Sequence, residues 1–505
     1  MFKRVLGDYD PYIFWLTLVV LAIAIIIGII APDQFAAALN TAQSFIVTNF
    51  SWFYMLVIAG AIGFIFWMFF SKYGSIKLGK DSDKPEYSNF AWFAMLFSCG
   101  IGVGFLFWGV AEPLNHFMQP PYLAAGDTPA AAPVGIMISV LHWGIHGWVV
   151  YAVIGMALAY STYRLGNPLK FSSTLYPILG EKAEGPLGKI VDFLAVFATI
   201  AGISTTLGMG VISIKYGTTF LFGFTMTELY VIIALIILIA AYTISAITGL
   251  NRGIKKLSTL NMYLAFFVLA FIFIFGPTRF LLDLMSDSLG AYISNFVFMT
   301  FWTDSVNKDP WLGWWTIFYW AWWLAWGPFV GGFIARISKG RTIREFIVGV
   351  LFAPLALTVV WFSFVGGATI HAQSTGLVDM WGAVSADVGS GIYTLLSAYP
   401  LGGIIAYVVF LNMLTFIITS ADSASFFVSM IVSKGNPEPK IGMRIIWGIS
   451  LGLSAIILTL SGGLQALQTV SIVAALPFAV VMIAMAVAFV KNIMNDPSIK
   501  LDKAA

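Results

Sequence analysis

Apolar runs long enough to cross a bilayer recur along the whole of this chain. A helix of about 20 apolar residues spans the hydrocarbon core of a membrane. Of the 505 residues, 60% are hydrophobic and only 10% are charged, whereas a soluble domain carries about a quarter charged residues. The sequence therefore predicts an all-α membrane protein. We expect twelve transmembrane helices, over residues 12–31, 50–71, 90–111, 138–161, 188–215, 227–247, 259–276, 312–334, 347–369, 404–431, 442–461 and 470–491.

Basic residues are unevenly distributed among the segments that connect these runs. An even number of spans places both termini on one side of the membrane. If that side is the cytoplasm, 23 of the 26 Lys and Arg residues are cytoplasmic, and only Lys215, Arg279 and Lys308 are not. Because positively charged segments mark the cytoplasmic side, we predict a multi-pass protein of the cell (inner) membrane with both termini in the cytoplasm.

Segment 278–300, between the seventh and eighth runs, mixes charged and apolar residues. Arg279, Asp283 and Asp287 stand among leucines and phenylalanines. This pattern is typical of an amphipathic helix along the outer, periplasmic membrane face, and equally of a buried helix in a periplasmic loop. The single cysteine, Cys99, excludes an intrachain disulfide and any multi-cysteine metal site.

Four tryptophans lie within seven residues of the eighth run, in the stretch YWAWWLAWGPF. At 100° per residue, Trp322, Trp323 and Trp326 fall within roughly a 100° arc of one helix. Tryptophan faces attract cations, and quaternary ammonium groups above all. An aromatic belt at the membrane interface is the alternative. A belt sits at a helix end, whereas this cluster lies well inside its run, so the pattern favours a cage for a quaternary ammonium group.

Glycines punctuate the third run at Gly100, Gly102 and Gly104. Glycine costs about 1 kcal/mol relative to alanine inside a helix, so three at alternate positions favour a helix break. Broken helices expose carbonyls that bind ions and substrates. Close packing between helices is the alternative role of small residues in membranes.

Two further runs carry polar residues. In the fourth run, Trp143, Trp148 and Tyr151 fit within roughly a 140° arc. His142 and His146 have the spacing of a metal pair, but we identify no carboxylate or thiol partner near them and predict no transition-metal site. In the tenth run, the hydroxyls of Thr419 and Ser420 are suited to a small cation, or else bond to the preceding helical turn.

The absence of several motifs excludes further function classes. The sequence contains no nucleophile–base pair, P-loop or ATPase signature, and no filter motif typical of a channel. It therefore predicts a secondary transporter rather than an enzyme or an ATP-driven pump. The net charge of +3 gives no indication of a nucleic-acid partner, and we expect none. We expect no cofactor apart from a coupling ion.

Several stretches together resemble the betaine–carnitine–choline transporter (BCCT) family. They are YWAWWLAWGPFVGGFIARISKGRTIREF (319–346), GVAEPL (109–114), HWGIHGWVVYA (142–152) and FIITSADSAS (416–425). The resemblance covers nearly the whole chain and implies a single transporter domain over 1–505 with a LeuT-like fold. Two extra helices (12–71) would precede two inverted five-helix repeats (90–276 and 312–491). It also implies a homotrimer, with helix 278–300 at the trimer contact, and a trimethylammonium-type substrate.

The resemblance also implies a site, residue by residue. The substrate positions match Trp143, Trp148, Tyr151, Trp320, Trp322, Trp323 and Trp326, with the glycine stretch Gly100, Gly102 and Gly104. One sodium site matches Ser98, Ile101, Phe416, Thr419 and Ser420. A second matches Thr199 and Phe329, but Ile203 replaces its second threonine.

The family resemblance further separates the possible substrates and coupling modes. Choline-preferring members tend to carry an aspartate at the position of Gly104, so glycine implies a zwitterion such as a betaine. The site residues imply sodium-coupled import of a betaine-type solute. A sodium-independent substrate:product exchanger of carnitine or betaine type is the alternative.

Overall fold

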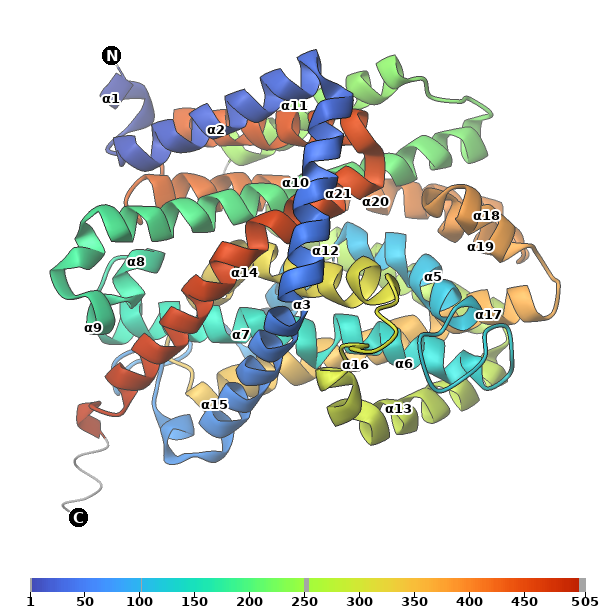
Figure 1. Ribbon diagram of the computed structural model, residues 1–505, viewed down its shortest axis with the longest axis horizontal. Coiled ribbons are helices and arrows are strands. Elements are labelled where there is room, and N and C mark those ends of the chain that lie inside the picture. The colour runs from blue at the N-terminus through green and yellow to red at the C-terminus, as the bar shows by residue number, and fades with distance from the viewer. Residues whose placement is uncertain (1, 101, 249–253, 499–505) are drawn as a thin grey trace.

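The computed structural model describes residues 2–100, 102–248 and 254–498 (Figure 1). It describes the side-chain surroundings of all these residues except 2–3, 94, 97–100, 248 and 254–256. Most of this part is helical, as predicted. The long or broken membrane-type helices are α2 (Pro11–Ile30), α3 (Pro32–Phe70), α4 (Asn89–Gly100), α5 (Val103–Met118), α6 (Ala131–Trp143), α7 (Ile145–Ala159), α10 (Pro186–Phe222), α11 (Glu228–Thr248), α12 (Ile254–Phe275), α14 (Phe318–Ile337), α20 (Gly402–Val432) and α21 (Ile441–Ile493).

The remaining elements are mostly short. They are α1 (Phe2–Leu6), η1 (Lys72–Ser75), η2 (Tyr160–Arg164), α8 (Phe171–Thr174), α9 (Tyr176–Leu179), η3 (Gly180–Glu184), α13 (Thr278–Phe301), η4 (Gly313–Ile317), α15 (Ile343–Ile347), η5 (Val348–Phe352), α16 (Ala353–Trp361), η6 (Phe362–Gly366), α17 (Gly367–Ser374), α18 (Met380–Ala386), η7 (Val388–Ser390) and α19 (Gly391–Ser397). Among them, α13 is longer, with 24 residues, and those from α15 to α17 together form one further membrane-type stretch, Ile343–Ser374. In Figure 1, α1, α8, α9 and the end of α21 lie on the left, whereas α17, α18 and α19 lie on the right.

Nine helices of the described residues are long and apolar enough to cross a membrane. The prediction of twelve differs from this number in three places. The third run is divided between α4 and α5, both short, and the eighth run divides between η4 and the tryptophan-rich α14. The last two runs lie in α21, whose 53 residues include non-helical backbone at Gly462 and Gly463. The structure thus supports a multi-pass membrane protein, and twelve spans stay a prediction.

The third and fourth predicted runs are each interrupted at a glycine, and only the interruption of the third run was predicted. α4 ends at Gly100 and α5 begins at Val103, with non-helical φ −133° and ψ −143° at Gly102, so the predicted break in the glycine stretch is confirmed. The fourth run was predicted as one helix over 138–161. It is instead divided at Gly144, where φ is −92° and ψ is −134°. The break leaves carbonyls at the end of α6 without helical partners, and these must find other donors.

The segment between the seventh and eighth runs is helical, as predicted, and forms α13. Leu281 and Leu284 are buried, and both lie close to Gly367 at the start of α17. The opposite side carries exposed apolar residues such as Ile293 and Val297. One side of α13 therefore packs on the protein, while the other presents apolar surface.

The RTIREF motif (341–346) after α14 binds the segment at the start of α4. Thr342 and Glu345 form a capping box at the start of α15. Arg341 donates to Asn89 Oδ1 (2.8 Å) and to the Tyr87 carbonyl (2.9 Å), and its guanidinium lies 4.0 Å from the Trp92 ring centroid. The motif therefore has a structural role at the end of the helix that carries the tryptophans.

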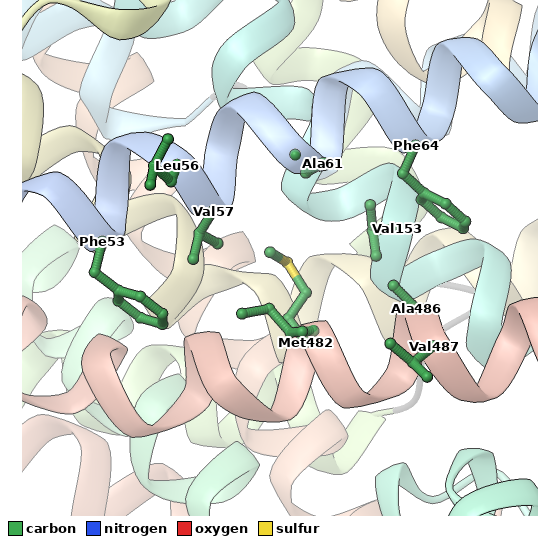
Figure 2. Close-up of a pocket in the computed structure, with 11 residues that line it drawn as sticks. Phe53, Leu56, Val57, Ala61, Phe64, Val153, Met482, Ala486 and Val487 are labelled. Carbon is green, nitrogen blue, oxygen red and sulfur yellow. The ribbon is translucent and has the colours of Figure 1, made fainter.

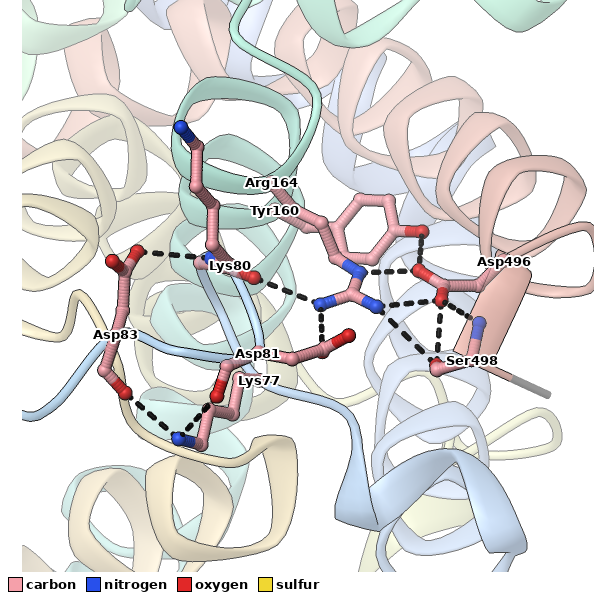
Figure 3. Close-up of polar contacts among 9 residues, drawn as sticks. Lys77, Lys80, Asp81, Asp83, Tyr160, Arg164, Asp496 and Ser498 are labelled. Carbon is pink, nitrogen blue, oxygen red and sulfur yellow. Dashed lines mark hydrogen bonds and ion pairs between the residues drawn. The ribbon is translucent and has the colours of Figure 1, made fainter. Parts of the chain in front are cut away.

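A second polar network joins the end of α21 to η2 and the loop after η1 (Figure 3). Arg164 forms a two-point ion pair with Asp496 and also bonds to Asp81 Oδ1 at 2.8 Å. Tyr160 and Ser498 donate to the same Asp496 carboxylate, both at 2.6 Å. Burial alone would raise the pKa of Asp496, but the hydrogen bonds from Arg164, Ser498 and Tyr160 outweigh it and hold the pKa well below its usual range.

Candidate functional site

The tryptophans of α14 form a buried aromatic cluster with the residues on either side of the α6–α7 break. The Trp143 ring lies 5.1 Å from Trp323 and 5.7 Å from Trp322, edge to face in both cases. Tyr151 meets Trp323 edge to face at 5.6 Å, and Trp322 meets Trp326 at 6.4 Å. The structure thus brings together these five predicted cage residues, which we call the tryptophan cluster.

Helix breaks and glycines hold the indoles of the cluster in place. Trp323 Nε1 donates to the His142 carbonyl at 2.8 Å, one of the carbonyls that the break at Gly144 leaves unpaired. Trp326 Nε1 donates to the Gly202 carbonyl of α10 at 2.9 Å. Both of these buried indole N–H groups therefore have an acceptor.

Gly104 lies directly against the cluster. A Cβ at Gly104 would stand 2.3 Å from Trp143 Cη2 and 3.1 Å from Trp322 Cη2. This close approach places the start of α5 against two of the rings. Gly102 precedes it at the break, where a Cβ would be 3.5 Å from Ser420 Oγ. The glycine stretch therefore separates the tryptophan cluster from the hydroxyls of α20.

The predicted first sodium site is described in part. Thr419 is buried, and its hydroxyl lies 3.0 Å from the Thr415 carbonyl and 3.1 Å from that of Phe416. Asn261 of α12, which the sequence did not single out, donates to Thr419 Oγ1 at 3.1 Å. Ser420 faces the glycine break as described above. Ile101 lies outside the described residues, as does the side chain of Ser98.

Comparison with known proteins identifies the family. The family description "BCCT, betaine/carnitine/choline family transporter" matches residues 12–498. The chain belongs to this family. The "Glycine betaine transporter OpuD" of Bacillus subtilis is 40% identical over 486 residues, covering 96% of this chain and 94% of that protein. The "Ectoine/hydroxyectoine transporter" of Virgibacillus pantothenticus is 37% identical over 481 residues, covering 95% of each.

Another relative is longer than this chain. The "Glycine betaine transporter" of Acinetobacter baylyi is 40% identical over 491 residues, which cover 97% of this chain but 74% of that protein. The predicted family is thus confirmed, and the protein is a transporter rather than an enzyme.

Two tryptophans that the BCCT resemblance assigned to the substrate site lie beside the cluster. Trp320 turns its ring to α7 and α3, where it stacks on His146 (5.4 Å, 5°) and contacts Met55 Sδ with Nε1 at 3.1 Å. Around the axis of α14, Trp320 lies about 110° from the centre of the arc that Trp322, Trp323 and Trp326 share. Its ring therefore points away from the tryptophan cluster. Trp148 is buried and touches the cluster through Tyr151, at 5.5 Å.

Sequence reasoning missed a buried polar network behind the cluster. Glu112, in GVAEPL, accepts hydrogen bonds from Trp143 Nε1 (2.7 Å) and from the Tyr319 hydroxyl. It also pairs with His142 Nδ1 at 2.6 Å. The expectation that no carboxylate lies near His142 was therefore wrong. Nor do His142 and His146 form a pair, because His146 Nε2 bonds to Thr300 Oγ1 of α13 at 2.8 Å.

The residues predicted for a second sodium site, Thr199 and Phe329, are both buried. Thr199 donates to the Ala195 carbonyl at 2.8 Å, an ordinary bond to its own helix. Ile203 is fully buried and offers no oxygen. Phe329 packs against Trp326 at 5.8 Å, at the end of the cluster. Ile203 therefore supplies apolar packing at the position where the BCCT resemblance implied a second threonine, and the second sodium site stays a prediction.

A separate pocket of about 320 Å³ lies between α3 and α21, with Val153 of α7 at its base. Figure 2 shows its lining, which is apolar throughout apart from the sulfur of Met482. A zwitterionic solute would find no hydrogen-bonding partner there. The tryptophan cluster is the better candidate for the substrate site.

Proposed function

We propose that this BCCT transporter imports a glycine betaine-type solute by sodium symport. The observation that carries the substrate class is the tryptophan cluster, whose faces attract a trimethylammonium group. Trp322 and Trp323 lie 5.8 Å apart at 26°, with Trp143 nearly perpendicular to both. The names of the relatives in Bacillus subtilis and Acinetobacter baylyi support the same substrate.

The cluster binds its substrate only after its rings separate. A cation is attracted within about 6 Å of a ring centroid, so two rings on either side of it stand about twice that distance apart. The rings around Trp143 and Trp323 are 5.1–5.8 Å from one another. We propose that the rings part during transport and close again around the trimethylammonium group.

Sodium coupling is supported by the hydroxyls of α20. Ser420 Oγ lies beside Gly102 at the α4–α5 break, and Thr419 precedes Ser420 on α20. Broken helices expose carbonyls that can bind a small cation. Runs 90–111, 188–215 and 404–431 contain no arginine that could replace the ion. Sodium-independent exchange is the second candidate, and the weak second site, with Ile203 in place of a hydroxyl, favours at most one sodium ion.

The remaining architecture is proposed with the function. Twelve spans in a LeuT-like arrangement, with both termini cytoplasmic in the inner membrane, agree with the charge distribution of the connecting segments. The exposed apolar side of α13 supports a contact between copies in a homotrimer.

Uptake by the purified protein in proteoliposomes tests this function. We expect labelled glycine betaine to accumulate when sodium is high outside and low inside, and to do so weakly in potassium. Counterflow that is equally fast without sodium would establish the exchanger instead. Absence of glycine betaine transport under both conditions would overturn the substrate assignment.

Gly104→Asp is expected to reverse the substrate preference. The aspartate places a negative charge against Trp143 and Trp322, where it repels the carboxylate of glycine betaine. Choline has no carboxylate and is therefore not repelled. Because a Cβ at Gly104 meets Trp143 at 2.3 Å, the indole must also shift, so total uptake should fall. Gly104→Ala is the control for this steric effect. Uptake of choline and of glycine betaine is measured for each variant. If both variants lose choline uptake and glycine betaine uptake equally, the prediction is wrong.

A further inference from the structure

Three ionisable side chains converge at one point behind the tryptophan cluster. Glu112 and His116 lie one turn apart on α5, and His142 faces them from the end of α6. All three are fully buried, and one ligand atom from each lies within 4.8 Å of the others. His142 Nδ1 is 2.6 Å from Glu112 Oε1, and His116 Nε2 is 3.4 Å from that same oxygen.

The outer atoms of this triad are held by neighbouring hydrogen bonds. The second carboxylate oxygen, Glu112 Oε2, accepts from Trp143 and Tyr319. His142 Nε2 pairs with Thr316 Oγ1 of η4 at 3.0 Å. Metal-binding histidines and carboxylates are oriented in this way, by bonds from the atoms that do not face the ion. When Nε2 of His142 donates to Thr316, the Nδ1 lone pair faces the carboxylate, an arrangement that a shared cation stabilises.

His116 gives the second, independent indication. Neither of its ring nitrogens has a hydrogen-bond partner, although the side chain is 0% exposed. Its Nε2 lies 3.4 Å from Glu112 Oε1, at the long end of polar contacts, and the rings of Trp311 and Trp315 lie beside it with centroids at 5.1 and 4.6 Å. Buried polar atoms are nearly always paired, so an unpaired imidazole beside a carboxylate calls for a ligand.

We propose that Glu112, His116 and His142 bind a divalent transition-metal ion of the Zn²⁺ class. Two imidazole nitrogens and one carboxylate oxygen are ligands that Zn²⁺ accepts, with a fourth position open to water. In such a tetrahedron the ligand atoms stand about 3.4 Å apart. The 3.4 Å between His116 and Glu112 already fits, and the 2.6 Å between His142 and Glu112 lengthens as the ion enters.

The site would be coupled to transport through Glu112. Its carboxylate holds the indole of Trp143, which is part of the tryptophan cluster. A bound divalent ion therefore places net positive charge behind the rings and opposes the trimethylammonium group of the substrate. We expect the metal to inhibit uptake. This readout rests on the proposed function, whereas metal binding itself does not.

Equilibrium metal binding by the full-length protein in detergent tests the proposal. After chelator treatment, the protein is titrated with Zn²⁺, and with Co²⁺ to record the visible absorption of a tetrahedral site. We expect one ion per chain. His116→Gln should weaken binding by more than about 100-fold, since loss of a ligand exceeds the 10–100-fold loss typical of an outer partner. Thr316→Val should weaken it by about 10–100-fold. His371→Gln, on α17 and outside the triad, is the matched control and should leave affinity unchanged.

The Thr316 variant leaves all three ligands in place, so it remains informative if His116→Gln fails to fold. Thermal unfolding and gel filtration establish which variants are folded. The proposal is overturned if the wild-type protein binds no stoichiometric Zn²⁺ or Co²⁺, or if the His116 and Thr316 variants bind as tightly as the His371 variant. Stoichiometric metal binding without glycine betaine uptake would instead overturn the proposed substrate and leave the metal site standing.

Discussion

Replacing Trp323 by leucine is expected to weaken binding of glycine betaine by at least about 30-fold. A desolvated cation–π contact with tryptophan contributes about 2 kcal/mol or more, and 2 kcal/mol corresponds to roughly a 30-fold change in affinity. Trp323 contacts three other cluster members, Trp143, Tyr151 and Trp322, all within 5.8 Å. Leucine keeps an apolar side chain but has no π face.

Two companion variants separate the lost cation–π contact from general damage. Trp323→Phe keeps a weaker aromatic face and should bind with intermediate affinity, although both variants lose the bond to the His142 carbonyl. Trp314 provides the matched control, because it lies in η4 directly before α14 and its side chain is 62% exposed. Trp314→Leu should bind glycine betaine normally. Binding is measured by the quenching of intrinsic fluorescence or by calorimetry. An affinity for glycine betaine that is unchanged in folded Trp323→Leu would remove this residue from the substrate site.

Local periodicity was sufficient to predict the centre of the tryptophan cluster. Trp322, Trp323 and Trp326 share one arc of α14, and the structure places all three rings against α6, α7 and α10. The same periodicity places Tyr319 within that arc and Trp320 outside it. The BCCT resemblance included Trp320 among the substrate positions and did not include Tyr319, which the structure places against Trp143 at 5.6 Å.

Contacts between segments that are distant in the sequence could not be predicted from the sequence alone. Glu112 stands 30 residues from His142 and 207 from Tyr319, and no local pattern indicates that the three meet. The break at Gly144 is similar, because a single glycine is common in membrane helices, whereas the triple pattern at Gly100, Gly102 and Gly104 is not. Both features arise from packing among α5, α6 and α14, which one sequence does not reveal.

The double variant Thr419→Val, Ser420→Ala is expected to raise the sodium concentration for half-maximal uptake by roughly 100-fold, or to abolish uptake. A polar contact to a charged group contributes about 1.5 kcal/mol or more. Two lost hydroxyl contacts to sodium therefore cost about 3 kcal/mol, which corresponds to roughly 100-fold. Uptake of labelled glycine betaine across a range of sodium concentrations measures the shift.

The structure also dictates the controls for this experiment. Valine at 419 leaves Asn261 Nδ2 without its acceptor, which destabilises the fold by about 1–3 kcal/mol, so thermal unfolding must be compared first. Thr415→Val, one turn earlier on α20, removes a hydroxyl that bonds to the Leu411 and Asn412 carbonyls of its own helix, each at 3.0 Å. That variant should keep the wild-type sodium dependence. If the double variant is folded and retains it too, the hydroxyls of Thr419 and Ser420 are structural and the ion binds elsewhere. If wild-type uptake ignores sodium altogether, exchange is the mechanism, and the contacts of Thr419 with its own helix and Asn261 account for its burial without any ion.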